Sequence, residues 1–443
     1  MLNDTIVALA TPNMKSAISI IRLSGSESIA LVNKIFSRDL TMMNANTINY
    51  GYILDKDQKV DEVLVSIFKA PKSYTCEDVV EINSHGGIAI SRKILNLVLS
   101  HGARLAEPGE FSQRAYLNNR IDMLEIEAIS EMIEATSETA AQLAMSGLSQ
   151  QTTKLIKQFK TDLLQIIAQI EVNIDYPEYD DVKELSNQEV KTSLLQFKKE
   201  IVSIIDYSKT SNLIKNGVKI AIVGRPNVGK SSLLNAFLEH NKAIVTEIAG
   251  TTRDIVEAEY LLNGINLIFL DTAGIRDTAD LIENMGIERS LQASKEADLV
   301  ILVLDATNKE LNSFEKDLIA ANKEKLIVVS NKKDLSDTSL LGIPVSAMKG
   351  EIEELKAEII RKLDLDIDMA NERLFLSNQR HLALLNQIDM SIDNAIKSIE
   401  QQLPSDLVVT DIEEAYDNLE NLLGERYHDS LLDELFSRFC LGK

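Results

Sequence analysis

Apolar residues follow two different patterns along the chain. In the first 118 residues, and again between residues 216 and 365, short apolar runs alternate with polar turns, as expected for strands of a buried sheet. Between Asp122 and Leu213 glycine is almost absent and apolar residues recur at helical spacing. Leu374–Gln402 and Asp406–Phe439 repeat this spacing and predict two more long helices. The chain therefore predicts an α+β domain, a helical domain and an α/β domain.

We place the domain bounds where these patterns change. The predicted segments are an N-terminal domain at 1–118, the first half of a helical domain at 119–215, an α/β domain at 216–365 and the second helical half at 366–443. Helices on both sides of the α/β domain indicate that it is inserted into one helical domain, since the two ends of a domain usually lie close together. Within the first domain we expect strands at Ile18–Leu23, Glu62–Phe68 and Asp78–Asn83 and a helix at Ile88–Leu99, and a later helix ends at Asp175-Tyr176-Pro177.

The most specific motif is a phosphate-binding loop at residues 224–231. Its sequence, Gly-Arg-Pro-Asn-Val-Gly-Lys-Ser, fits G-x-x-x-x-G-K-[ST] at every fixed position. The apolar run Val218–Val223 precedes it and a helical pattern follows it, so backbone N–H groups and a helix N-terminus surround one anion. Lys230 can reach the β- and γ-phosphates, and the Ser231 hydroxyl can bind Mg²⁺. The remaining candidates at this loop are Asn227, Val228, Gly229 and Ser232.

Three further motifs follow strands in the order that is typical of GTP-binding domains. In Asp271-Thr272-Ala273-Gly274 the Asp is expected to hold Mg²⁺ through water and the Gly N–H to contact the γ-phosphate. In Asn331-Lys332-Lys333-Asp334 the Asp can accept two hydrogen bonds from guanine that adenine cannot donate. At Ser346-Ala347 a backbone N–H can meet guanine O6. Four ordered motifs at strand ends predict GTP binding.

The same domain carries signals of a Ras-like arrangement, with one departure. Asn263-Gly264 between two apolar runs predicts a hairpin, and hence one antiparallel pair in an otherwise parallel sheet. Upstream, Thr251 or Thr252 is placed to complete the Mg²⁺ shell. Ras-type enzymes orient the attacking water with a Gln after the D-x-x-G motif, but Ile275 stands there and cannot hold water. The candidates to replace that Gln are Asp277, Asp280, Glu283 and Glu288, and the sequence pattern leaves the choice open.

The composition of the chain indicates which binding partners and which cell compartment to expect. The 443 residues carry a net charge of −22, and an acidic surface repels phosphate backbones, which disfavours nonspecific nucleic-acid binding. No apolar run approaches the roughly 20 residues of a membrane span, and Met1–Ala10 lacks the pattern of a signal peptide. The two cysteines, Cys76 and Cys440, give no disulfide framework, which is consistent with a reducing cytosol, and the five histidines indicate no metal cluster.

Several short segments outside these motifs stand in a characteristic order. They are Ile20–Gly25 (Ile-Ile-Arg-Leu-Ser-Gly), Ser73–Asp78 (Ser-Tyr-Thr-Cys-Glu-Asp), His85–Gly87, Pro108–Phe111, Arg114–Asn118, Gly250–Asp254 and the terminal Cys440–Lys443 (Cys-Leu-Gly-Lys). With these segments the chain resembles, over its full length, the tRNA modification GTPase family called MnmE or TrmE. The resemblance implies an N-terminal tetrahydrofolate-binding domain that dimerises, a central helical domain and a mobile inserted GTPase domain.

The resemblance also implies an activity, cofactors and partners. In the family, this GTPase and the flavoprotein MnmG form a heterotetramer-like complex that adds an aminomethyl-type group to C5 of the wobble uridine in certain tRNAs. We therefore expect a cytoplasmic homodimer that meets tRNA mostly through that complex, without a membrane. The implied cofactors are GTP, Mg²⁺, K⁺ and either 5,10-methylenetetrahydrofolate or 5-formyltetrahydrofolate.

The family's functional residues fall on identifiable positions of this chain. Folate contacts fall on Arg22, Glu81 and Arg120, with Lys443 nearby. Potassium ligands fall on Asn227, Thr246, Ile248 and Thr251, and magnesium ligands on Ser231, Thr252 and Asp271. The catalytic residues are Glu283, which orients the water, and Lys230.

The chain departs from the family pattern at a few positions. Asn13–Ala17 stands where many members have a glycine-rich stretch, and Cys76 stands where glycine is usual. Both departures touch the folate half. Arg120 stands where Lys is frequent, and Leu441 replaces a common Ile. The GTPase motifs are intact, and the role of Cys440 is open.

A second class of function shares every GTPase motif. A GTP-switched assembly or scaffold protein, for example one associated with the ribosome, would carry the same loop and the same guanine-reading residues. Such a scaffold would need neither the N-terminal segments nor the Cys-Leu-Gly-Lys end. Those segments favour tRNA modification.

Overall fold

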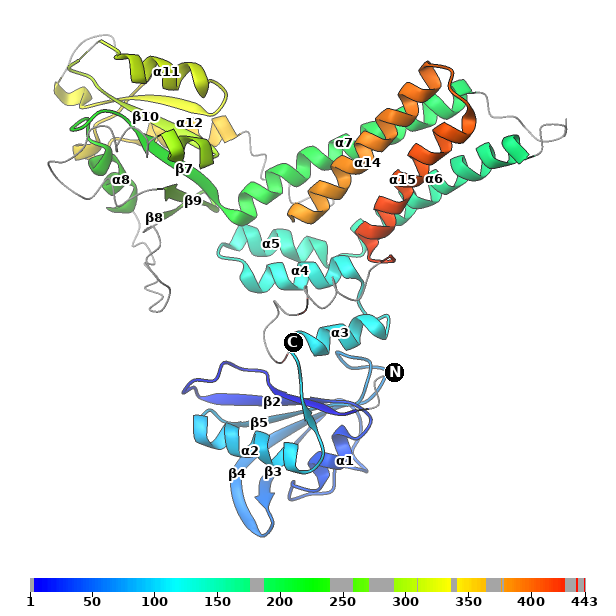
Figure 1. Ribbon diagram of the computed structural model, residues 1–443. Helices are drawn as coiled ribbons and strands as arrows, with labels where there is room; N and C mark the ends of the chain where they lie inside the picture. Colours follow the sequence, from blue (N-terminus) through cyan, green and yellow to red (C-terminus); the bar gives the residue numbers. More distant parts are fainter. Residues whose placement is uncertain are drawn as a thin grey trace. The chain divides into compact units, whose positions relative to one another are not determined.

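A computed structural model describes residues 4–175, 187–239, 258–270, 291–308, 310–335, 341–363, 376, 378–426, 436 and 442. The chain forms two compact units. The first comprises residues 1–130, 153–169 and 412–443, and the second comprises residues 131–152 and 170–411. Each unit contains one six-stranded sheet (Figure 1).

The sheet of the first unit has the strand order β3-β4-β5-β2-β1-β6. Its strands are β1 (Ile6–Leu9), β2 (Ile18–Ser24), β3 (Thr47–Asp55), β4 (Gln58–Phe68), β5 (Val79–His85) and β6 (Arg104–Leu105). Neighbouring strands are antiparallel except β1 and β6, which are parallel. Helices α1 (Ser28–Asn33) and α2 (Ile88–Ser100) pack on one face, where Val7, Ile21 and Ile94 are fully buried. The three strands and the helix predicted in this region are confirmed.

Successive side chains of β1 are buried on opposite faces of this sheet, so that a second buried cluster forms on the face away from α1 and α2. Val7 joins the core under α1 and α2, whereas its neighbours Ile6 and Ala8 pack with Phe111 of α3 (Glu110–Leu117). Side chains of a strand point alternately to the two faces, which is why consecutive residues enter different clusters. The position of α3 brings the segments around Tyr74 and Phe111 to the same face.

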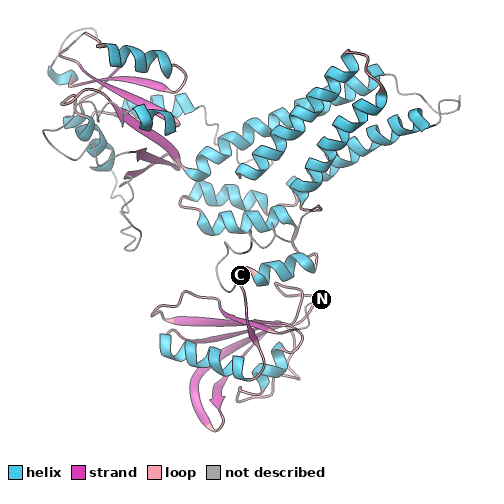
Figure 2. Cartoon of the chain, in the orientation of Figure 1, coloured by secondary structure: helices cyan, strands magenta, loops and turns pink. Residues whose placement is uncertain are grey.

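Long helices precede and follow the part of the chain that forms the second sheet (Figure 2). They are α4 (Met123–Glu134), α5 (Glu138–Gly147), α6 (Gln151–Asp175), α7 (Asn187–Asn216), α14 (Gln379–Glu400) and α15 (Ser405–Leu423). Helix α6 is described up to Asp175, and the rest of the predicted break, Tyr176-Pro177, lies outside the described residues. In the second unit α14 packs along α7, and an ion pair at 2.9 Å joins Lys191 to Glu400. No helix in the described part of the chain has both the length and the apolar composition needed to cross a membrane.

The two predicted C-terminal helices are shorter than expected. The prediction of one helix over Leu374–Gln402 was wrong at its start, because Asn378 caps α14 by accepting a hydrogen bond from the His381 N–H at 2.8 Å. The prediction of one helix over Asp406–Phe439 was wrong at its end. Helix α15 ends at Leu423, and the next residue, Gly424, takes a left-handed φ of 79° that terminates the helix.

The sheet of the second unit has the order β12-β11-β10-β7-β9-β8. Its strands are β7 (Val218–Val223), β8 (Ala258–Leu262), β9 (Ile265–Leu270), β10 (Leu299–Asp305), β11 (Leu326–Asn331) and β12 (Ile343–Pro344). All neighbours are parallel except β8 and β9. The hairpin at Asn263-Gly264 is confirmed, with both residues at positive φ, 49° and 83°. This is the inserted Ras-like domain that the motifs predicted.

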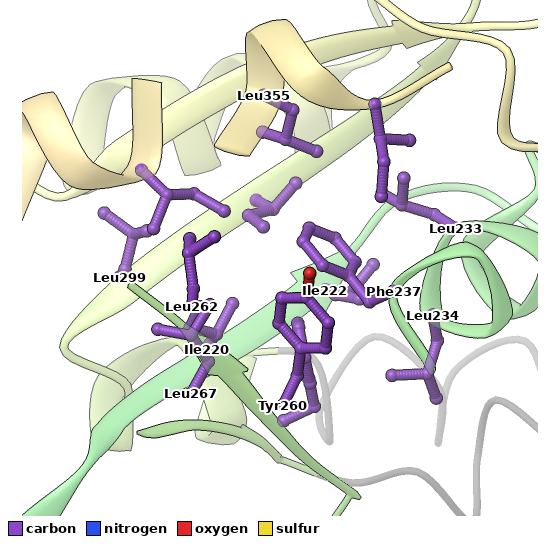
Figure 3. Close-up of a cluster of buried hydrophobic side chains, with 14 of the residues drawn as sticks. Ile220, Ile222, Leu233, Leu234, Phe237, Tyr260, Leu262, Leu267, Leu299 and Leu355 are labelled. Atoms are coloured by element: carbon purple, nitrogen blue, oxygen red, sulfur yellow. The ribbon is translucent and has the colours of Figure 1, made fainter. Parts of the chain in front are cut away.

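Three helices of the inserted domain pack against this sheet. They are α8 (Lys230–Glu239), α11 (Ser313–Ala321) and α12 (Glu353–Leu363). Figure 3 shows Phe237 of α8 against Tyr260 of β8, at a ring distance of 5.4 Å, in the core between sheet and helices. Leu143 of α5 and Ile214 of α7 belong to the same buried cluster. The inserted domain and these two helices therefore share one core within the second unit.

Candidate functional site

The phosphate-binding loop connects β7 to α8, as the motif requires. Gly224, with φ 151°, passes so close to β10 that an added Cβ would lie 2.4 Å from the Val303 carbonyl oxygen. Gly229, with φ 96°, leaves room for the Asn331 amide, which would lie 2.2 Å from an added Cβ. Both glycines are thus required by left-handed backbone and by close approach. Gly229 also brings the phosphate loop against the guanine-reading motif.

Lys230 begins helix α8 and its side chain folds back over the loop. Its Nζ donates hydrogen bonds to the carbonyl oxygens of Gly224 at 2.9 Å and Arg225 at 2.8 Å. Burial lowers the pKa of the Lys230 ammonium. Two neutral carbonyls compensate a buried cation only partly, so this position favours an anion such as a phosphate. Ser231 and Ser232 follow in the first turn of α8, and Ser231 is exposed.

Asn331 locks the guanine-reading motif to the phosphate loop. It ends β11 and is buried. Its Nδ2 donates to the Val228 carbonyl at 2.9 Å, and its Oδ1 accepts from the Ala347 N–H at 3.0 Å. One side chain therefore joins three of the predicted motifs. The residues concerned are far apart in the sequence and meet because the carboxyl ends of parallel strands share one edge of the sheet.

Asp334 is held ready to accept hydrogen bonds. The Ser346 Oγ donates to Asp334 Oδ1 at 2.9 Å. This hydrogen bond lowers the pKa of the Asp334 carboxyl, which therefore stays ionised at neutral pH. Asp334 is exposed, so its second oxygen can reach a ligand. A fixed, ionised carboxylate of this kind suits the paired N1–H and N2 donors of guanine.

Lys332 lies across the phosphate loop. Its Nζ donates to the Asn227 carbonyl at 3.0 Å and to Asp305 Oδ2 at 2.6 Å. Burial opposes ionisation of Asp305, but hydrogen bonds from Lys332 and Thr307 outweigh it and lower the pKa of that carboxyl. Asn227 itself has a left-handed φ of 60° and an exposed side chain.

Asp305 was not predicted from the sequence as a site residue. It ends β10, the strand between the one that leads into the phosphate loop and the one that leads into Asn331. An Asp at the carboxyl end of a central parallel strand was an available signal, because side chains at that edge converge on the ligand site. Asp305 positions Lys332 and belongs to the candidate nucleotide site.

Several predicted site residues lie outside the described residues. These are Thr246, Ile248, Thr251, Thr252, Asp271, Thr272, Ala273, Gly274, Glu283, Cys440 and Lys443. The described strand β9 ends at Leu270, which pairs with Ala221 of β7. The described part of the nucleotide site therefore comprises the phosphate loop at 224–232, Asp305 and the motifs at Asn331 and Ser346.

A second cluster of predicted residues gathers in the first unit. Arg22 of β2 and Glu81 of β5 are opposite each other in the sheet, and Arg22 Nε lies 2.8 Å from Glu81 Oε1. The Arg22 guanidinium lies 5.8 Å from the ring centres of Tyr74 and Phe111. Arg120, the third predicted residue of this cluster, lies over the same Tyr74 ring, with its guanidinium 4.9 Å from the ring centre. Two cations, one carboxylate and two aromatic rings thus meet at one place.

The sequence predicted no role for the rings of Tyr74 and Phe111, or for the network of ion pairs around Arg114. Arg114 is almost completely buried and donates to Asp4, Glu77 and Glu110 at 2.7–3.1 Å. Burial opposes ionisation of Glu110, but hydrogen bonds from Arg104 and from the Glu107 N–H outweigh it, and the pKa of Glu110 falls below its usual value. The network ties the segment of Tyr74 to α3.

The nucleotide site defines the class of protein. A phosphate loop between a strand and a helix, with an Asn–Asp pair at the neighbouring strand end, is the guanine-nucleotide site of a P-loop GTPase. A family model described as "GTP-binding protein TrmE N-terminus" matches residues 5–120, and a model described as "MnmE helical domain" matches residues 123–440. The chain belongs to the tRNA modification GTPase MnmE family.

Curated relatives support this assignment over the whole length. The chain is 45% identical over 448 residues to the tRNA modification GTPase MnmE of Acholeplasma laidlawii, covering 99% of both chains. It is 42% identical over 458 residues to the protein of the same name from Bacillus subtilis, covering 99% of this chain and 100% of that one. Among solved structures, the FeoB G-domain of Methanococcus jannaschii matches 33% of this chain and 98% of its own, at 29% identity and a TM-score of 0.25.

Proposed function

We propose that this protein hydrolyses GTP to drive tRNA modification, adding an aminomethyl-type group to C5 of the wobble uridine of certain tRNAs together with the flavoprotein MnmG. The observation that carries the proposal is the combination of full-length family membership with a sequence that contains all four GTPase motifs. In the nucleotide site Asn331 and Asp334 are hydrogen-bonded in place beside the phosphate loop.

The described residues suggest how GTP is bound and which groups act on it. Asp334 accepts hydrogen bonds from guanine, the Ala347 segment borders O6, and Lys230 exchanges its two carbonyl partners for the β- and γ-phosphates. Lys230 then neutralises charge that develops on the γ-phosphate during transfer to water. Glu283 is the residue proposed to orient that water, because Ile275 stands at the position of the usual Gln.

We also propose a magnesium site at the same edge of the sheet. Ser231 offers an exposed hydroxyl one residue after Lys230, and Asp271 follows the end of β9, the strand beside β7. Hydroxyl and carboxylate oxygens are the donors that Mg²⁺ prefers, so we propose Ser231 and Thr252 as direct ligands and Asp271 as a ligand through water. Bound Mg²⁺ would supply positive charge between the phosphates.

Potassium is proposed at Asn227, with Thr246, Ile248 and Thr251 as further ligands. The left-handed backbone of Asn227, fixed by the hydrogen bond from Lys332, leaves its amide side chain exposed next to the phosphate loop. An amide oxygen in that place suits a monovalent cation, whose charge would replace that of an arginine finger.

The cluster around Tyr74 is the proposed folate site. A reduced folate carries a flat pterin ring, an N–H edge and a glutamate tail, and the cluster offers aromatic faces, the Glu81 carboxylate and the cations Arg22 and Arg120. Lys443 is proposed nearby. Calorimetry with 5-formyltetrahydrofolate tests this assignment on the full chain and on Arg120→Ala, and absence of binding heat at saturating ligand contradicts it.

We propose further that the protein is a cytoplasmic homodimer. With a net charge of −22 it would contact tRNA mostly within the complex with MnmG, whose surface would supply the positive charge. Sedimentation of the purified chain without nucleotide tests the dimer, and a monomer at micromolar concentration contradicts it.

Nucleoside analysis of tRNA tests the function itself. Cells that lack the protein should lose C5-modified wobble uridines, and the wild-type gene should restore them. A variant with Asp334→Asn should not restore them at normal GTP levels. Unchanged tRNA together with defective ribosomes would instead support a GTP-switched assembly factor.

A further inference from the structure

The second residue of the phosphate loop, Arg225, is joined to the first turn of α11 and to the segment before it. Its Nη2 donates hydrogen bonds to Glu315 Oε2 and to the Glu310 carbonyl. Glu315 is buried, with only 2% of its side chain exposed. The positive charge of Arg225 is therefore already neutralised by a buried carboxylate of the protein.

Glu315 is itself fixed by the helix that carries it. The same Oε2 accepts from the Asn312 N–H at 2.9 Å, and the Asn312 Oδ1 accepts from the Glu315 N–H at 2.8 Å. This reciprocal pair is a capping box, which satisfies two N–H groups at the start of α11. A carboxylate that is held in this way cannot follow Arg225, so it acts as a fixed point for the phosphate loop.

Side-chain packing contributes little to the position of the first half of the phosphate loop. Arg225 and Pro226 line a cavity of about 210 Å³, whose wall also includes Leu304, Leu311 and Glu315. Pro226 is exposed and has no backbone N–H to donate. A loop beside open space can shift at little cost, so its position here depends on the ion pair between Arg225 and Glu315.

This ion pair is better explained by the position that it imposes than by stability. Taking two charges out of water costs about as much as their attraction returns, so a buried ion pair adds little to stability by itself. The Arg225 Nε is in addition buried without a hydrogen-bond partner among the described residues, which is unfavourable. The pair does fix the place of the Arg225 backbone, whose carbonyl accepts from Lys230 Nζ at 2.8 Å.

We propose that Arg225 is a positioning residue, which acts through Glu315 to hold the phosphate loop in its binding conformation before a nucleotide arrives. Without the ion pair, the loop is ordered only when the phosphates bind, and the cost of ordering it weakens GTP and GDP binding alike. Once bound, the phosphates themselves hold the loop, so the rate of hydrolysis changes little. The proposal rests on the nucleotide binding proposed above and not on tRNA modification.

Calorimetry with GDP and steady-state GTP hydrolysis, both at fixed Mg²⁺ and K⁺, test this role on the full-length protein. Arg225→Ala should weaken GDP binding about five- to thirtyfold, the equivalent of ordering the backbone of one residue. KM for GTP should rise in parallel, while kcat stays within about twofold of wild type. Arg225→Lys should recover part of the affinity, because an ammonium can still pair with Glu315.

Arg361→Ala is the matched control. Arg361 also pairs with a glutamate of the inserted domain, Glu358, but it does so within α12 and with 73% of its side chain exposed. Its removal should leave GDP affinity and KM for GTP at the wild-type values.

A double variant separates positioning from folding. In Arg225→Ala the Glu315 carboxylate stays buried without its cation, so the protein should unfold at a lower temperature. Adding Glu315→Gln removes this charge and should restore part of the stability, but the ion pair is still absent and GDP affinity should stay weak. Recovery of affinity together with stability in the double variant would overturn the proposal, because the affinity would then follow the fold alone.

Two other results would also overturn it. One is wild-type GDP affinity in Arg225→Ala. The other is a kcat that falls tenfold or more at unchanged KM, which is the result expected of an arginine that acts on the transition state. A wild-type protein that binds no GDP would contradict the proposed nucleotide site, and the role of Arg225 with it, whereas the results above contradict the role of Arg225 alone.

Discussion

Replacing Asn331 by alanine tests the joint between the phosphate loop and the guanine-reading motif. The side chain is buried and makes two hydrogen bonds, one to the Val228 carbonyl and one from the Ala347 N–H. Both partner residues are themselves buried. In Asn331→Ala the Val228 oxygen and the Ala347 nitrogen lose their partner together.

The cost follows from these two unpaired groups. A buried polar group that loses its partner costs about 1–3 kcal/mol, so two of them cost roughly 2–4 kcal/mol once some relaxation is allowed. If all of this appeared as lost nucleotide affinity, binding would weaken roughly 30- to 700-fold. Part of the cost is already present without nucleotide, and we therefore expect GDP affinity to fall about tenfold or more.

Calorimetric titration with GDP at fixed Mg²⁺ and K⁺ measures this effect. Asn308→Ala is the matched control, because Asn308 is exposed and its side chain accepts a hydrogen bond from the exposed Glu310 N–H at 3.2 Å. Asn331→Asp keeps the acceptor for Ala347 but turns a carboxylate oxygen toward the Val228 carbonyl, so it should bind no better than the alanine variant. GDP binding by Asn331→Ala within about twofold of wild type would refute the role given to this side chain.

Four further predictions concern other single residues. Asp334→Asn should weaken GTP binding and admit xanthosine triphosphate, whose acceptor at position 2 matches the amide; unchanged GTP affinity by calorimetry would contradict this. Asn227→Ala should remove the preference for K⁺ over Na⁺ in GTPase assays, and an unaltered preference would exclude Asn227 as a ligand. Glu283→Ala should lower kcat and leave GTP binding intact, since water orientation matters in the transition state; a wild-type kcat would pass the role to another carboxylate. Glu110 has a lowered pKa in the folded state, so it stabilises the first unit above its unfolded pKa and this contribution is lost as pH falls through the folded value. Glu110→Gln should therefore reduce the pH dependence of acid unfolding, and an unchanged acid midpoint and slope by circular dichroism would contradict the assignment.

The ends of the helices show where a local sequence pattern no longer predicts the structure. Apolar spacing continues past Gly424, and it led to the prediction of one helix up to Phe439. Helix α15 ends at Leu423 because Gly424 adopts a left-handed backbone that glycine takes at little cost. The spacing of apolar residues indicates which side chains are buried. The end of a helix, in contrast, depends on the backbone conformation of a single residue.

Cys76 gives a related case in the first unit. Its φ is 59°, a left-handed value that costs a non-glycine residue roughly 1–2 kcal/mol. The family resemblance places glycine here, and the backbone supplies the physical reason for that preference. The sequence alone identified the departure, and the fold explains why glycine is usual at this position.

The sequence by itself determined the features that depend only on residues close together in the chain. The phosphate loop, the Asn263-Gly264 hairpin and the order of the GTPase motifs follow from glycine positions and from apolar runs that bound them. The tertiary structure alone decided which side chains meet. Asp305 reaches Lys332 because parallel strands end at one edge of the sheet. Arg22 bonds to Gly442, 420 positions away in the chain, and no local pattern encodes a contact at that separation, since it exists only when the fold of the first unit brings the two segments together.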